Sequence, residues 1–322
     1  MKKLWTALFI LSIFACQKKQ DEFASQKSVG NTNSVSVFID DNLWIGEIGD
    51  SIRKKFAAPV DGLPQEEPLF TLNQYTPQAF DGRLLKSRNV ILIKKETKNF
   101  FEVGQNQYAI PQNIVKISAN STAGILQHLS QNSDAMVKLF QATETAQLQK
   151  NISTDAVFVD KVRKKFKLSV NVPKEFKLVL EKDGFFWFKK EIQSGNLSLL
   201  LYEIPVSAIN PNEAVADIVK IRDSVGSLYI HGTMEQSKMA TEDSYMPYLF
   251  ATEIDGKKTY QTKGNWELKN DFMSGPFVNY CIMDSKNNRI LVIEGFSYAP
   301  STPKRDLMFE LDAIIKTIQF LK

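Results

Sequence analysis

FKLVLEKDGFFWFKKEIQSGNLSLLLYEIP, residues 176–205, contains three runs of branched and aromatic side chains. Two short sets of turn residues, Asp183–Gly184 and Ser194–Asn196, separate these runs. Apolar runs joined by such short turns are typical of β-hairpins. Because consecutive hairpins pair neighbouring strands antiparallel, this stretch predicts an antiparallel sheet.

The chain on both sides of these hairpins extends the same pattern. KLSVNVP precedes them as another strand-like run, and more strand-like runs follow them. Residues 210–225 predict a helix with Val215, Ile218 and Val225 on its inner face. Another helix closes the chain, so the second half predicts the α+β class, with helices packed on antiparallel strands.

The N-terminal half also mixes helices and strands. Its strand-like runs lie at residues 34–40, 69–75 and 89–95. Residues 120–149 have helical spacing and predict two helices, with a break at the polar stretch Ser130–Asp134. Closely spaced strands begin after Asn151, which predicts two α+β domains at residues 34–150 and 151–322.

The N-terminus has the pattern of a bacterial targeting segment. Lys2 and Lys3 precede an apolar run, Leu4–Phe14. The run is shorter than the roughly 20 apolar residues of a transmembrane helix, and it matches the apolar part of a signal peptide. Cys16 follows Ala15 directly. The stretch SIFAC resembles the bacterial lipobox, whose cysteine receives a diacylglyceryl thioether.

We therefore expect residues 1–15 to be a signal peptide and the acylated Cys16 to anchor the chain in a lipid bilayer. The alternative is an ordinary secretory signal, but its cleavage pattern needs a small residue where Ile13 stands. Residues 16–33 are polar and predict a flexible tether. The expected location is the cell envelope, at the outer membrane. Both its periplasmic face and the cell surface remain open, because CQKKQDE resembles export signals of some Bacteroidota lipoproteins.

Charge and composition argue against nucleic acid as a partner. The chain has a net charge of +4, which falls to +2 when Lys2 and Lys3 leave with the signal peptide. Proteins that bind nucleic acid usually show a strong basic excess or a basic stripe, and neither is visible in the sequence. The hydrophobic content of 43% is that of an ordinary folded protein.

The sequence predicts no catalytic residue, metal ligand or cofactor. Cys281, the only cysteine besides Cys16, lies in the apolar run GPFVNYCIMD and is expected to be a core residue. The only histidines, His128 and His231, are isolated and lack the spacing of zinc ligands. Phosphate-binding, dinucleotide-binding and nucleophile-elbow motifs are also missing from the sequence.

Paired acidic residues are the only hint of hydrolytic chemistry. Two carboxylates on either side of a glycosidic bond can cleave it. The pairs Asp40/Asp41, Glu66/Glu67 and Glu242/Asp243 could in principle supply them. Nothing in their sequence surroundings selects one of them, and solvated loops explain them more simply.

The stretch GNWELKNDFMSGPF, residues 264–277, is the one candidate binding loop. Gly275 and Pro276 predict a sharp turn, and Trp266, Phe272 and Phe277 lie around it. One interpretation is a binding surface formed by converging aromatic side chains. The other, which we favour, is a turn that its aromatic residues hold in the core.

Several stretches resemble known families. The order of strands and helices in the second half is similar to the sandwich of PsbP-like and Mog1-like proteins. The stretches DDNLWIGEIGDSIRKKFAAPVDGLPQEEPLFTL, FFWFKKE, GNWELKNDFMSGPFVNYCIMD and GFSYAPSTPKRDLM resemble a family of Bacteroidota lipoproteins known as domain of unknown function 4837. The resemblance covers about Val35 to Phe320. It implies an envelope lipoprotein and no particular chemistry.

These observations favour a non-enzymatic envelope lipoprotein that binds another protein or an envelope component. The prediction depends on an anchor, a folded body and the lack of a catalytic motif. The alternative is an envelope hydrolase of unrecognised type that acts on glycan or lipid.

Overall fold

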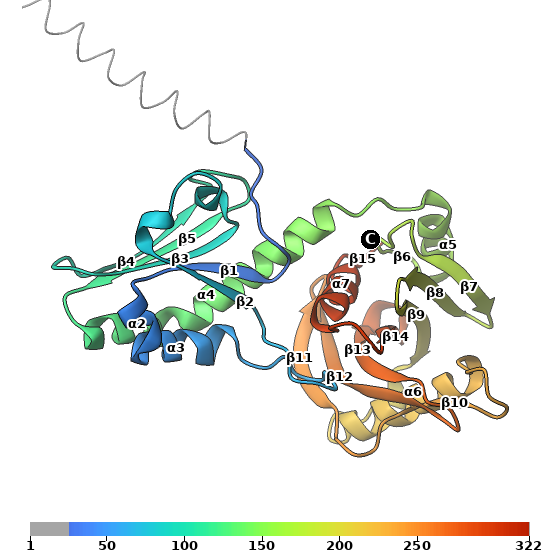
Figure 1. Cartoon of the computed structure of the whole chain (residues 1–322). Coiled ribbons are helices and arrows are strands. Elements are labelled where there is room, and N and C mark those ends of the chain that lie inside the picture. The colour runs from blue at the N-terminus through green and yellow to red at the C-terminus, as the bar shows by residue number, and fades with distance from the viewer. Residues whose placement is uncertain (1–25, 322) are drawn as a thin grey trace, which may run out of the picture. The chain divides into compact units, whose positions relative to one another are not determined.

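The computed structural model describes residues 26–321, which form two compact units (Figure 1). The first unit contains the chain up to Ala58 together with Pro68–Gln147. The second contains Pro59–Glu67 together with the chain from Leu148. The predicted signal peptide, Cys16 and tether residues 16–25 lie outside the described residues.

The first unit is a five-stranded sheet with its α-helices on one face. The strand order is β2-β1-β3-β5-β4, and only β4 runs antiparallel to its neighbour. The strands are β1 (Ser34–Phe38), β2 (Thr71–Tyr75), β3 (Asn89–Lys95), β4 (Phe100–Gln105) and β5 (Asn113–Ala119). The helices are α2 (Asp41–Ile45), α3 (Glu47–Phe56) and α4 (Thr122–Lys150). The antiparallel pairing predicted for the chain does not extend to this sheet, because helices connect β1 to β2 and such a crossover makes the two strands parallel.

Helix α4 is one continuous helix, so the predicted break at Ser130–Asp134 is wrong. Polar side chains in this region bond to carbonyl oxygens one turn back instead of opening the helix. Ser133 Oγ donates to Leu129 O at 2.5 Å, and Asn132 Nδ2 donates to His128 O at 2.8 Å. Such bonds satisfy the polar groups inside the helical conformation.

The last residues of the predicted tether pair with the first unit. Lys27 and Val29 form isolated β-bridges with Ile110 and Ser87. The Arg88 guanidinium donates to the carbonyl oxygens of the next residues, Gly30 and Asn31, at 3.0 and 3.1 Å. Within residues 26–33, the chain therefore has a fixed path on the first unit.

The second unit confirms the antiparallel sheet predicted from its hairpins. The strand order is β10-β12-β13-β14-β9-β8-β7, with β11 also paired to β12, and every pair is antiparallel. The strands are β7 (Lys177–Lys182), β8 (Phe185–Ile192), β9 (Gly195–Pro205), β10 (Lys238–Thr241), β11 (Tyr248–Ile254), β12 (Lys257–Lys269), β13 (Ser274–Asp284) and β14 (Arg289–Tyr298). A separate short ladder pairs β6 (Leu168–Ser169) with β15 (Gln319–Phe320).

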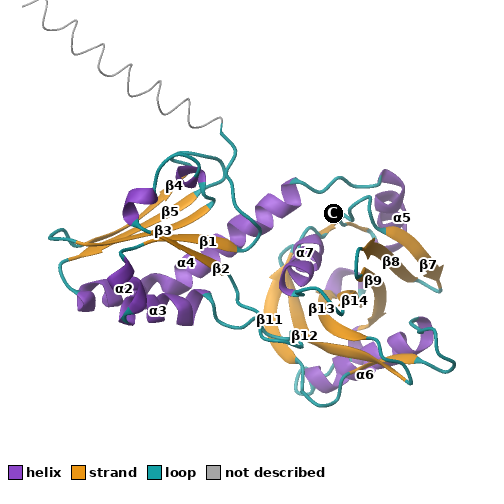
Figure 2. Ribbon diagram, viewed as in Figure 1, coloured by secondary structure: helices purple, strands orange, loops and turns teal. Residues whose placement is uncertain are grey.

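Helices cover both faces of this sheet (Figure 2). Helices α5 (Ala156–Phe166) and α7 (Arg305–Ile315) pack on one face, and α6 (Ala214–Tyr229) packs on the other. Successive residues of β9 therefore enter different cores: Leu199 and Leu201 pack with α7, whereas Leu200 and Tyr202 pack with α6. The predicted α+β class is confirmed.

The sequence predicted a single boundary between the units near Asn151, and the structure differs from this in one respect. Residues 59–67, which precede β2 in the chain, belong to the second unit. Within residues 26–321, the apolar stretches of the helices are too short to cross a membrane.

Candidate binding site

The structure separates the aromatic residues of the predicted binding loop. Trp266 and Phe277 are both buried, and they lie on β12 and β13. Trp266 pairs with Gly275 across the ladder, and its Nε1 donates to Ser297 O at 3.2 Å. An added Cβ at Gly275 would lie 2.0 Å from the Ser297 carbonyl oxygen, so only glycine fits there.

Pro276 also lies inside the ladder, opposite Asn265. The β12–β13 ladder thus contains four of the five residues of the predicted loop: Trp266, Gly275, Pro276 and Phe277. Their side chains do not converge on an exposed loop. Phe272 is the exception, because 97% of its surface is exposed in the turn between β12 and β13.

Phe272 lies close to a second exposed apolar residue, Met234, because both backbone N–H groups donate to Asp271, and we call these two residues the apolar tip. Met234 lies in the loop before β10 and is 56% exposed. Sequence reasoning missed Met234, because it lies in no recognisable motif.

One carboxylate joins the two loops of the apolar tip. Asp271 Oδ2 accepts hydrogen bonds from the backbone N–H groups of Thr233 and Met234 at 3.1 and 3.4 Å. Asp271 Oδ1 accepts from the N–H of Phe272 at 2.7 Å. An added Cβ at Gly232 would lie 2.2 Å from Asp271 Oδ2, so glycine allows this close approach. Hydrogen bonds to Asp271 therefore fix the two loops of the tip relative to each other.

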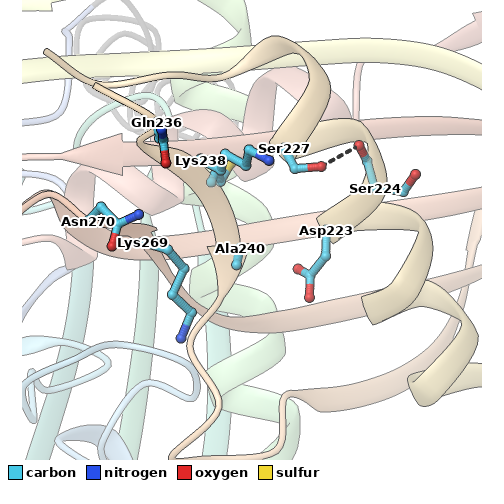
Figure 3. Close-up of a pocket in the computed structure, with 9 residues that line it drawn as sticks. Asp223, Ser224, Ser227, Gln236, Lys238, Ala240, Lys269 and Asn270 are labelled. Carbon is cyan, nitrogen blue, oxygen red and sulfur yellow. Dashed lines mark hydrogen bonds between the residues drawn. The ribbon is translucent and has the colours of Figure 1, made fainter. Parts of the chain in front are cut away.

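A hollow of about 570 Å³ is lined in part by Gln236 and Asn270, which lie close in sequence to Met234 and Phe272. Figure 3 shows the side chains that line it. Its lining comes from α6, β10 and the end of β12: Asp223, Ser224, Ser227, Gln236, Lys238, Met239, Ala240, Lys269 and Asn270. Thr241 donates to Asp223 Oδ1 through its backbone N–H at 2.6 Å and its hydroxyl at 2.7 Å, so this carboxylate is already engaged.

Lys238 and Lys269 both line this hollow, and they lie directly opposite each other across the β10–β12 ladder. A hydrogen bond from Lys269 to Glu267 raises the pKa of Lys269, and Asp243 adds to the effect. Lys238 has no ion pair among the described residues. The lining offers hydroxyl, amide, ammonium and carboxylate groups, which can bind polar groups.

The cysteine and the two histidines singled out in the sequence all contact neighbouring groups of the protein. Cys281 is buried in the core beneath α6, where burial raises the pKa of its thiol and nearby Glu294 adds to the rise. His128 contacts Asn99 Oδ1 at 2.6 Å, and His231 Nδ1 contacts Ser237 O at 3.0 Å. No group of metal-ligating side chains gathers anywhere in residues 26–321.

Fold and site together define an α+β protein with a sheet covered on both faces and an exposed apolar tip. The chain belongs to the family described as Domain of unknown function (DUF4837), which matches residues 155–317, half of the chain. Residues 28–153 match a different family, Domain of unknown function (DUF8532). The resemblance expected over nearly the whole mature chain therefore holds for the second half.

Solved structures offer only a distant likeness. A mutant of the protein Mog1 is 12% identical with a TM-score of 0.33, covering 48% of this chain and 92% of that one. The Saccharomyces cerevisiae Ran-binding protein Mog1p is 12% identical with a TM-score of 0.31, covering 48% and 91%. Human StAR-related lipid transfer protein 5 is 10% identical with a TM-score of 0.25, covering 54% and 93%. No protein with a curated description matches the sequence. At these values the structures do not inform the function.

Proposed function

We propose that this protein is a lipid-anchored binding module of the bacterial envelope and that it binds a partner protein through the apolar tip. The observation that carries the proposal is the nearly complete exposure of Phe272 on a loop held by Asp271. Burying a phenylalanine side chain stabilises a complex by about 1.5–3 kcal/mol, so its exposure leaves this energy for a partner. Aromatic side chains are also enriched at the centres of protein interfaces.

The arrangement of the tip supports a binding role. Two exposed apolar residues, Met234 and Phe272, lie on segments that hydrogen bonds to Asp271 hold together. A prearranged surface loses less conformational entropy on binding than a loose loop does. The polar hollow beside the tip supplies donors and acceptors of the kind found at the rim of an interface.

Substitution of the exposed aromatic residue tests this role. We expect Phe272→Ser to abolish most crosslinking of the membrane-anchored protein to its partner, with a change in the free energy of unfolding of less than about 0.5 kcal/mol. The partner is captured in living cells by a photo-crosslinking amino acid at position 234, and crosslinked bands are compared between the two forms.

Val157→Ser is the matched control, because Val157 is another exposed apolar residue, on α5 at the other face of the sheet. This control should crosslink as well as the original protein. Equal band intensities for Phe272→Ser and the original protein would rule out the tip as the contact surface.

The anchor is tested separately. Cells that express the protein are fed an alkyne-bearing fatty acid, and the label on the protein is measured after extraction. We expect labelling of the original protein and complete loss of label in Cys16→Ser, because Cys16 is the proposed site of acylation. Cys281→Ser should keep the label, since Cys281 is buried in the core. Equal label on Cys16→Ser would exclude the anchor.

A further inference from the structure

The second unit has another concave surface, and none of the residues that line it belongs to the apolar tip. It is a groove of about 520 Å³ between residues 59–66, residues 242–248 and the middle of β12. We call it the carboxylate groove, because Asp61, Glu66 and Glu242 line it. Its other lining residues include Tyr245, Met246, Tyr248, Lys263 and Asn265.

One wall of the groove is fixed to the body of the second unit. Gly62 has a φ of +80°, and an added Cβ would lie 2.8 Å from Lys263 Cβ, so the wall touches β12 closely. The next residue, Leu63, packs against the core beneath α7. The Glu67 carboxylate accepts hydrogen bonds from the backbone N–H groups of Lys304 and Arg305 at 2.6 and 2.9 Å. The groove is therefore preformed.

The charges that line the groove are not balanced by ion pairs. Among the described residues, Asp61, Glu66 and Glu242 have no salt-bridge partner, although basic residues outnumber acidic ones in the chain, 40 to 36. The one lysine in the lining, Lys263, places its Nζ 5.6 Å from the centre of the Phe250 ring. Three unpaired carboxylates in one concavity attract a cation, because a charge-assisted hydrogen bond to a carboxylate is stronger than a neutral one.

Aromatic faces complete the surroundings that a cation prefers. Tyr245 and Tyr248 are 77% and 52% exposed, and the Tyr248 ring stacks on Phe250 with centroids 6.5 Å apart. The electron-rich faces of such rings attract lysine and arginine side chains. The aliphatic stems of those side chains can also pack on Met246, which is largely exposed.

We propose that the carboxylate groove binds a lysine- or arginine-bearing segment of a partner protein. Charge complementarity selects this occupant over a neutral glycan, which would gain hydrogen bonds from the carboxylates but would leave their charge unbalanced. Binding of such a segment takes place at a second site. It does not depend on the apolar tip or on acylation of Cys16.

The test measures binding of three defined probes to the full mature protein by fluorescence anisotropy. The probes are fluorescein-labelled tetralysine, the matching tetraglutamate peptide and labelled chitotetraose. We expect tetralysine to bind, although the protein itself is net positive, and the affinity to fall as salt rises. Tetraglutamate and chitotetraose should not bind. Binding of chitotetraose in place of tetralysine, or of no probe at all, would overturn the proposal.

A pair of charge-neutralising variants places the binding in the groove. In Glu66→Gln/Glu242→Gln, tetralysine should bind about tenfold more weakly, because two charge-assisted contacts become neutral ones. Tyr245→Leu should weaken binding by about two- to fivefold through loss of the ring face. The matched control is Glu175→Gln/Glu235→Gln, which removes the same charge from two exposed residues without ion pairs among those described. If this control weakens binding as much as the groove variant, the binding is not at the groove.

Discussion

Replacement of Arg222 by methionine is expected to lower the free energy of unfolding of the second unit by about 3–5 kcal/mol. Arg222 lies on α6 with 2% of its side chain exposed, and its Nη2 forms an ion pair with Glu294 Oε1 at 2.9 Å. Glu294, on β14, is only 1% exposed. The substitution leaves this carboxylate buried without its cation, and the cost of removing an unpaired charge from water is large.

The surroundings of the pair explain why methionine cannot compensate. The Arg222 guanidinium lies 3.8 Å from the centre of the Phe277 ring, and its Nη1 donates to Thr241 Oγ1 at 2.9 Å. On the other side, Asn279 Nδ2 donates to Glu294 Oε2 at 2.9 Å. Methionine fills much of the same volume and can pack on the ring. It supplies neither the positive charge beside Glu294 nor the N–H donor to Thr241 Oγ1.

Chemical denaturation followed by tryptophan fluorescence measures this loss, because Trp266 is buried in the second unit. The control is Arg163→Met, which removes an exposed ion pair with Asp160 in the same unit and should cost less than about 1 kcal/mol. The double variant Arg222→Met/Glu294→Leu should recover much of the lost stability, because no charge remains buried. A loss below about 1 kcal/mol in Arg222→Met would contradict this account of the pair.

The hairpins of the second unit were predictable because their signals are local. Asp183 and Gly184 both have positive φ, as a two-residue turn that joins twisted strands requires. The strands β7 and β8 that flank this turn are read directly from their branched and aromatic residues. No distant part of the chain is needed for either inference.

Arg222 shows where local patterns fail. The predicted inner face of the helix contained Val215, Ile218 and Val225, whereas the residues buried along α6 follow a spacing of four: Ala214, Ile218, Arg222 and Gly226. The spacing itself was visible in the sequence. The spacing alone does not predict burial of Arg222, because an arginine is rarely buried without a partner and its partner, Glu294, lies far along the chain.

Sites built from distant segments were the least predictable. The predicted binding loop contributes only Phe272 to the apolar tip, because the ladder between β12 and β13 draws Trp266 and Phe277 into the core. The carboxylate groove joins Glu66 to Glu242, and it exists only because residues 59–67 fold with the second unit. The pairs Glu66/Glu67 and Glu242/Asp243 were visible in the sequence. No local pattern, however, indicates that Glu66 and Glu242 line the same groove.

A second large effect is expected in the first unit, from replacement of Glu144 by leucine. Glu144, on α4, is 2% exposed and accepts hydrogen bonds at 2.7 Å from both Arg88 Nε and Asn89 Nδ2. Asn89 in turn accepts from Asn113 Nδ2 at 3.0 Å, so one carboxylate ties α4 to β3 and β5. Leucine leaves the Arg88 cation without its counter-charge, and it leaves Arg88 Nε and Asn89 Nδ2 without their acceptor. We expect a loss of about 3–5 kcal/mol in the free energy of unfolding of this unit.

The same variant should also make residues 26–33 less firmly held on the first unit. Arg88 Nη2 donates to the carbonyl oxygens of Gly30 and Asn31, and the Glu144 carboxylate holds this guanidinium in place. Amide hydrogen exchange measures both effects: protection should fall across β3 and β5 and most strongly at residues 26–33. The exposed control Glu102→Leu, which removes a 3.5 Å ion pair with Lys116, should cost less than about 1 kcal/mol. Unchanged protection at residues 26–33 in Glu144→Leu would mean that the β-bridges at Lys27 and Val29, rather than Arg88, hold this segment to the body.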